Sequence, residues 1–135
     1  MPMKMQQIIN RTPSTRKDKA TFVKIKEVRT TKTPYNTTVF KAKTSSTHDS
    51  MGNPKRGSPT TYVTSIETNG KMSVVSCSCE DFAYRWEVAL NKKKAARIEY
   101  SNGDPPVDTN PTLIPGCCAH LVRFGQILLG KGKVI

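Results

Sequence analysis

Residues 77–82 read Cys-Ser-Cys-Glu-Asp-Phe, and residues 117–121 read Cys-Cys-Ala-His-Leu. These two short stretches contain all four cysteines of the 135-residue chain. Zinc in proteins is commonly held by four thiolate or imidazole ligands at the corners of a tetrahedron. The residues that supply a Cys3His set of this kind are Cys77, Cys79, Cys118 and His120. The sequence therefore predicts one structural zinc ion.

The backbone expected around each stretch lets these ligands converge. On an extended strand, residues i and i+2 point to the same face, so Cys77 and Cys79 can reach one ion. In a helix, residues two apart point about 200° away from each other, so Cys118 and His120 cannot converge from a helix interior. They can converge from the entrance of a helix that begins after the preceding Pro-Gly pair. The positive end of the helix dipole also favours a thiolate there.

Other interpretations of the cysteines stay open at this point. The thiols could be buried apolar residues without a metal, because free cysteine packs well in protein cores. They could form disulfides in a virion or an oxidising compartment, although adjacent and one-apart cysteines make strained bridges. Cys117 could replace Cys118 as the ligand. We favour Cys118, because a single residue between cysteine and histidine is the spacing that recurs in known sites.

The sequence predicts an α+β fold. Alternating or β-rich segments predict strands at residues 21–29, 37–43, 60–67 and 72–76. Asn69-Gly70 joins the last two and is a strong hairpin signal, because both turn positions need a positive φ. Residues 45–59 carry Ser, Gly, Pro and Asn without a pattern and are predicted to be a loop. We interpret His48 in this loop as a solvated side chain rather than an alternative ligand.

Two helices are expected in the C-terminal half. In residues 80–97, Phe82, Trp86 and Leu90 recur at helical spacing, which predicts an amphipathic helix with Trp86 in the core rather than stacked on a nucleic-acid base. Residues 98–116 contain several Pro and Gly pairs and are predicted to be irregular. A short closing helix is expected after Cys118.

Positive charge is concentrated in the N-terminal half. Residues 1–60 hold thirteen Lys or Arg against three acidic residues, whereas residues 61–135 hold nine against seven. Residues 1–20 show almost no apolar periodicity, so we expect an extended basic arm whose removal leaves the fold intact. The expected organisation is an arm at 1–20, strands and a loop at 21–59, and a zinc-binding domain at 60–135. The expected fold is a small zinc-stabilised β-hairpin plus helices, preceded by an extended, partly β, basic N-terminal arm.

Seven cationic side chains are candidate contacts to an anion or a partner. They are Arg11, Arg16, Lys17, Lys19, Lys92, Lys93 and Lys94. Lysine and arginine neutralise phosphates in nucleic-acid complexes. The same residues could equally form a solvated tail and a solvated helix end, so the sequence alone does not separate the two interpretations.

The cysteine and histidine stretches resemble the SWIM-type zinc finger. Its pattern is C-x-C, an aromatic residue three positions later, and C-x-H opening a helix, matched here by Cys77-Ser-Cys79-Glu-Asp-Phe82 and Cys118-Ala-His120-Leu121. The resemblance covers roughly residues 61–129 and implies a hairpin plus helix around one zinc, with binding to DNA or protein rather than catalysis. The gap from Cys79 to Cys118 is longer than in most members. Residues 84–111 within it resemble small SWIM-containing proteins of tailed phages.

No enzymatic signature accompanies this pattern. The sequence has no Gly-rich phosphate loop, hydrolase triad or nucleotide fingerprint. Glu80 and Asp81 stand beside the cysteines, but a general base would need an open zinc position, and four protein ligands close it. We therefore expect a protein that is not an enzyme and has no small-molecule substrate.

The expected function is a structural adaptor that docks onto partner protein subunits of a large assembly, a phage virion. The alternative is a DNA- or RNA-binding protein that uses the basic N-terminal half. No apolar run approaches the roughly 20 residues of a membrane helix, and residues 1–10 lack a signal-peptide pattern. We therefore expect synthesis in the host cytoplasm, where thiols stay reduced, followed by association with the virion.

Overall fold

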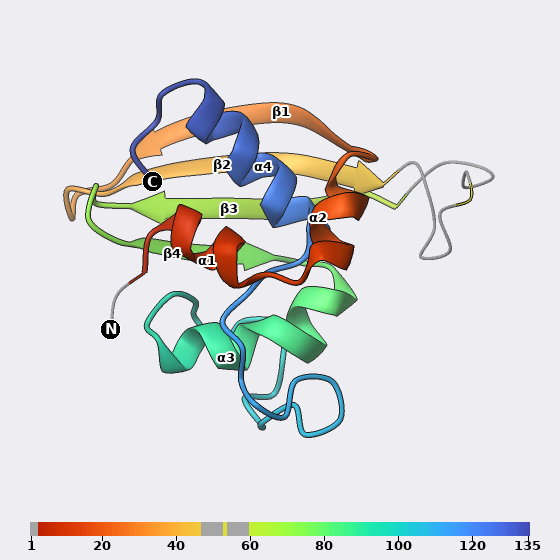
Figure 1. Cartoon of the computed structure of the whole chain (residues 1–135). Helices are drawn as coiled ribbons and strands as arrows, with labels where there is room; N and C mark the ends of the chain where they lie inside the picture. Colours follow the sequence, from red (N-terminus) through yellow and green to blue (C-terminus); the bar gives the residue numbers. More distant parts are fainter. Residues whose placement is uncertain (1–2, 47–52, 54–59) are drawn as a thin grey trace.

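A four-stranded antiparallel sheet forms the centre of the molecule (Figure 1). The computed structural model describes residues 3–46, 53 and 60–135. The strands are β1 (Val23–Lys32), β2 (Thr38–Ser46), β3 (Tyr62–Thr68) and β4 (Ser73–Cys77), and they lie side by side in chain order. Each corresponds to a predicted strand, so the α+β class is confirmed. The sheet also crosses the boundary predicted near residue 60, because β2 pairs with β3.

The helices α1 (Met5–Arg11), α2 (Ser14–Ala20) and α4 (Ala119–Gly130) lie over one face of this sheet (Figure 1). A π-helical turn at Phe82–Trp86 leads into α3 (Glu87–Lys92), which lies beyond the edge formed by β4. Under the helices, Phe40, Ile66 and Val75 lie opposite one another on neighbouring strands and are buried. Within the described residues, no helix is long and apolar enough to cross a membrane.

Residues 5–20 form two helices, so the prediction of an extended N-terminal arm is wrong. Met5, Ile8 and Ile9 are buried in the same core as α4. Gly125 of α4 permits this approach, because a Cβ at that position would lie 2.8 Å from the Cγ of Met5. The three apolar residues have helical spacing, but α1 is only seven residues long, so the pattern is too short to stand out in the sequence.

The predicted hairpin between β3 and β4 is confirmed, but its turn differs from the expectation. Thr68 pairs with Ser73, which leaves four residues in the loop. Gly70 has a φ of +88°, whereas Asn69 is not in the positive-φ region. The Asn69 side chain accepts hydrogen bonds from the amides of Lys71 and Met72 at 2.9 and 3.0 Å. Asparagine therefore caps the loop with its side chain rather than with a left-handed backbone.

The helix predicted at 80–97 ends at Lys92, and the irregular segment beyond it is held by a buried carboxylate. Glu87 is fully buried and accepts hydrogen bonds from the amides of Glu99, Tyr100 and Ser101 at 2.9 to 3.2 Å. The irregular conformation of residues 98–116 is as predicted. Ser45 and Ser46, which were predicted to lie in a loop at 45–59, belong to β2 instead, and His48 lies outside the described residues.

Replacing Ile8 by alanine should lower the free energy of unfolding by about 2–5 kcal/mol, the usual loss for a fully buried isoleucine. An extended arm would predict no change. Arg11→Ala serves as the control, because Arg11 is an exposed residue of the same helix. Chemical denaturation of both variants checks this, and equal stability of the two would contradict the packing of α1.

Candidate metal centre

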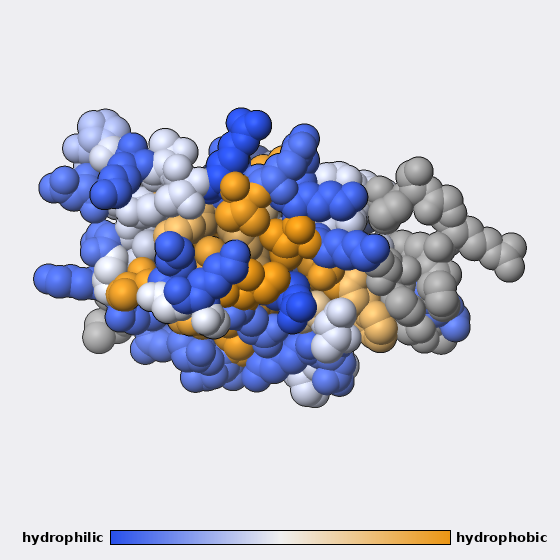
Figure 2. Space-filling model, turned by 90° about the horizontal axis from the view of Figure 1, so that it is seen from above, coloured by the Kyte–Doolittle hydropathy of each residue, from blue (hydrophilic) through white to orange (hydrophobic). Residues whose placement is uncertain are grey.

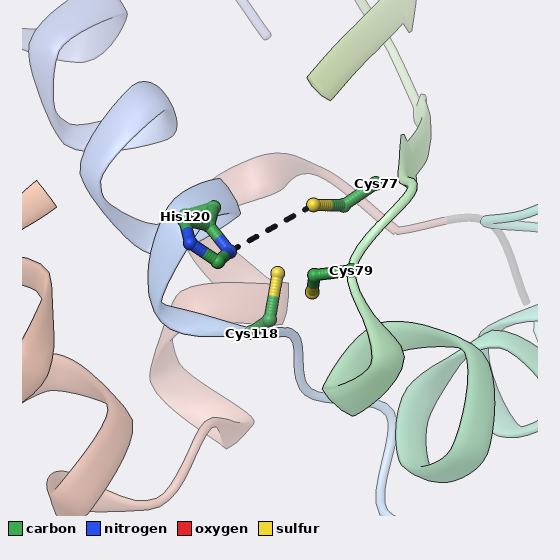
Figure 3. A group of neighbouring side chains, drawn as sticks. All are labelled: Cys77, Cys79, Cys118 and His120. Carbon is green, nitrogen blue, oxygen red and sulfur yellow. Dashed lines mark hydrogen bonds between the residues drawn. The ribbon is translucent and has the colours of Figure 1, made fainter. Parts of the chain in front are cut away.

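Four predicted ligands meet at the junction of β4 and α4. Cys77 is the last residue of β4, Cys79 lies two residues further on, Cys118 directly precedes α4, and His120 is in its first turn. Their side chains point toward one another (Figure 3). One ligand atom from each residue lies within 4.8 Å of all the others. All four residues are buried.

Local backbone conformation explains why these residues converge. Cys118 is extended, with φ −73° and ψ 166°, and its carbonyl accepts the first hydrogen bond of α4 from Val122 at 3.0 Å. His120 is therefore only two residues past the extended residue, at the helix entrance where convergence was predicted. In β4, the side chain of Cys77 points to the helix-covered face, as Val75 does. The predicted helix entrance is confirmed, whereas Cys79 lies in a bend beyond the end of β4 rather than on the strand itself.

The donor set fits one tetrahedral metal ion. With metal–sulfur bonds of about 2.3 Å and metal–nitrogen bonds of about 2.0–2.1 Å, tetrahedral sulfur and nitrogen ligands lie about 3.6 Å apart. Cys77 Sγ and His120 Nδ1 are 3.9 Å apart. A shared cation would satisfy three thiols and an imidazole that are buried together. Four protein ligands leave no open position on such an ion.

The imidazole of His120 is oriented from both sides. Its Nδ1 faces Cys77, and its Nε2 lies 3.3 Å from the hydroxyl oxygen of Ser46 at the end of β2. The Tyr62 ring packs against the imidazole with centroids 4.9 Å apart. With Nδ1 on a metal, Nε2 carries the hydrogen and donates it to Ser46, the kind of outer contact that fixes a ligating histidine. Ser46 was not predicted, because nothing in the sequence shows that β2 ends beside the ligands.

The three clustered thiols have different acidities. Burial raises the pKa of Cys77 and of Cys118 well above the ordinary value for a thiol. Hydrogen bonds from Cys118 and Cys77 hold the pKa of Cys79 well below that value. The amide of Phe82 also donates to Cys79 Sγ at 3.4 Å. All four cysteines are free thiols in this structure, so none of them forms a disulfide here.

Cys117 lies outside the ligand group. Its amide donates to the hydroxyl of Thr12 at 3.0 Å, and its sulfur lies 3.7 Å from the same oxygen. Complete burial raises the pKa of the Cys117 thiol to about 12. The structure thus assigns Cys118 to the cluster and Cys117 to the packing between the end of α1 and the start of α4.

A second layer of contacts surrounds the cysteine loop through Asp81. The Asp81 carboxylate accepts two hydrogen bonds from Arg16, at 2.8 and 3.2 Å, and one from the indole of Trp86 at 3.1 Å. Arg85 forms an ion pair with it at 3.2 Å. The Arg16 guanidinium also lies over the Trp86 ring, 5.8 Å from its centroid. Trp86 is buried, as predicted, and Arg16 is engaged within the molecule rather than directed at a partner.

The other candidate cations lie on separate helices. Arg11 ends α1, Lys17 and Lys19 are half-buried on α2, and Lys92 to Lys94 are exposed where α3 ends. They do not belong to the metal cluster. Protein-family models, curated proteins and solved structures were compared with the chain, and none of them matches it.

Cys79→Ser should abolish metal binding and cooperative folding, whereas Cys117→Ser should retain one metal ion per chain. A structural metal of this type contributes on the order of 10 kcal/mol of apparent folding free energy, against a net stability of about 5–15 kcal/mol. Elemental analysis together with thermal melting checks both variants. Metal retained at full stoichiometry in Cys79→Ser would remove Cys79 from the ligand set.

Ser46→Ala should weaken metal binding by about 10- to 100-fold, the usual effect of removing an outer partner of a ligating histidine. Ser65→Ala is the control, because Ser65 lies in β3 opposite Lys41 and Ser76, away from the cluster. Competition with a chelator gives the affinities. Unchanged affinity in Ser46→Ala would show that this hydroxyl does not orient the imidazole.

Proposed function

We propose that this protein is a non-enzymatic SWIM-type module in which one zinc ion fixes the junction of β4 and α4. A further part of the proposal is that it docks as an adaptor onto protein subunits of a large assembly, a phage virion. The observation that carries the first part is the closed and buried Cys3His group. Three thiolates and one imidazole form a ligand set typical of structural zinc, and its closure is the reason for proposing a structural rather than a catalytic ion.

An exposed apolar patch supports the docking role. Figure 2 shows apolar side chains gathered on the side of the molecule where β1 and α4 lie, with hydrophilic side chains around them. The apolar residues of these two elements that stay partly or fully exposed are Ile25, Val28, Ile127 and Leu129. An apolar patch with a polar rim is typical of a protein interaction site.

The free edge of β1 favours a protein as the occupant of this β1–α4 patch. The outer edge of β4 is covered, because the amides of Ser73 and Val75 donate to the carbonyls of Met3 and Ala95 at 2.7 and 2.8 Å. In the described part of the chain, no comparable bonds cover the outer edge of β1. A partner subunit can supply both an apolar surface and backbone hydrogen bonds there. The virion as the setting rests on the resemblance of residues 84–111 to small phage proteins.

Ile127→Lys should reduce incorporation of the protein into purified particles of its source, because the charge disrupts the β1–α4 patch. Val107→Lys is the control, since Val107 is 70% exposed and lies in the irregular segment. Both variants should keep one zinc ion and a wild-type melting curve. Quantitative mass spectrometry of purified particles gives the incorporation. Absence of the wild-type protein from the particles would refute the adaptor role, and undiminished incorporation of Ile127→Lys would refute the patch as its docking surface.

A further inference from the structure

The face of the sheet that the helices leave open is strongly cationic along β1 and β2. Strand register places one set of residues on this open sheet face, opposite to the buried Phe40 and Ala42. Its cations are Lys24, Lys26, Arg29, Lys41 and Lys43, all exposed. None of them is among the cations predicted as partner contacts. Lysines that alternate with apolar residues along a strand are usually just exposed to solvent, so the sequence does not single them out.

The pairing of these cations is unusual for a sheet. Lys26 lies directly opposite Lys43, and Arg29 lies directly opposite Lys41, so two neighbouring cross-strand pairs join like charges. Like charges at directly opposed positions destabilise a sheet. One acid offsets part of this repulsion, because Glu27 at the bulge of β1 lies 2.8 Å from the Lys43 ammonium. The remaining repulsion would be relieved by an anion that spans both strands.

The other half of the open sheet face carries little net charge. Over β3 and β4, Glu67 is paired with Arg97 at 3.2 Å, and Ser65, Val74 and Ser76 are its neighbours on the face. Glu99 lines the same hollow, so this half holds two acids and one cation. No outward-facing residue of the four strands is aromatic, and the nearby Tyr100 is hydrogen-bonded to Ser76 of β4, away from the cations of β1 and β2. Proteins that bind single-stranded nucleic acid stack its bases on aromatic side chains. Contacts to phosphates alone suit the backbone of a duplex.

We propose that the cationic half of the open sheet face binds the phosphate backbone of double-stranded nucleic acid without reading its sequence. The cations of β1 and β2 would each replace counterions along the duplex. This inference is independent of the adaptor role, because it uses the sheet face opposite to the helices rather than the β1–α4 patch. It is also independent of the seven cations that the sequence predicted as partner contacts.

The test measures binding of the zinc-loaded full chain to a short mixed-sequence DNA duplex by fluorescence anisotropy at several salt concentrations. On duplex DNA, log K falls with log salt with a slope of about −0.9 for each phosphate neutralised. Lys26→Gln with Lys41→Gln should make this slope shallower by about 2, because each removed cation accounts for about 1. The melting temperature of this variant should not fall, since each substitution removes one like-charge pair.

Lys92→Gln with Lys93→Gln is the matched control, because it removes the same charge from the exposed end of α3. The control should bind with the wild-type slope. Equal weakening by both double variants would show a bulk charge effect and overturn the proposal, as would a lack of duplex binding at low salt. Tighter binding of a single strand of the same length would also overturn it. Absence of the protein from purified particles would refute the adaptor role alone.

Discussion

The contact between Cys77 and His120, 43 residues apart in the sequence, joins the end of the sheet to the entrance of α4. Cys79 and Cys118 complete the same cluster from the two adjoining backbone segments. Buried thiols and an imidazole are unfavourable unless their polar atoms are satisfied. A shared cation would satisfy all four at once, and it would fix the direction in which α4 crosses the sheet. The packing of α1 and α2 against α4 depends on that direction.

The contacts that surround the cluster come largely from the N-terminal half of the chain. Ser46 at the end of β2 contacts the ring of His120, and Thr12 contacts Cys117. Arg16 forms an ion pair with Asp81, two residues after Cys79. Each is far from the ligands in sequence. The basic N-terminal segment thus helps to hold the Cys3His cluster in place. Arg16 of this segment forms an ion pair within the molecule, and the apolar residues of the segment are part of the core.

Features set by neighbouring residues can be predicted from this sequence, whereas features set by contacts between distant segments cannot. The ligand set follows from local spacing, and the hairpin follows from Asn69-Gly70 between two β-rich runs, so both can be predicted. The helical state of residues 5–20 depends on burial against α4, since Met5, Ile8 and Ile9 make too short a pattern to indicate a helix alone. Ser46 is missed for the same reason, because only the folded sheet brings it to His120.

The distribution of charge on the surface follows from where the sheet is covered. The helices bury one face, and five cations of β1 and β2, Lys24, Lys26, Arg29, Lys41 and Lys43, lie on the other. A sheet that needed only solubility could oppose lysine with glutamate and gain stability from each pair. This sheet opposes Lys26 with Lys43 and Arg29 with Lys41 instead. The proposed zinc ion would let the fold tolerate that repulsion, because the stability that it supplies does not depend on the pairing of surface charges. The positive potential that remains on the open face then favours an anionic partner over a neutral one.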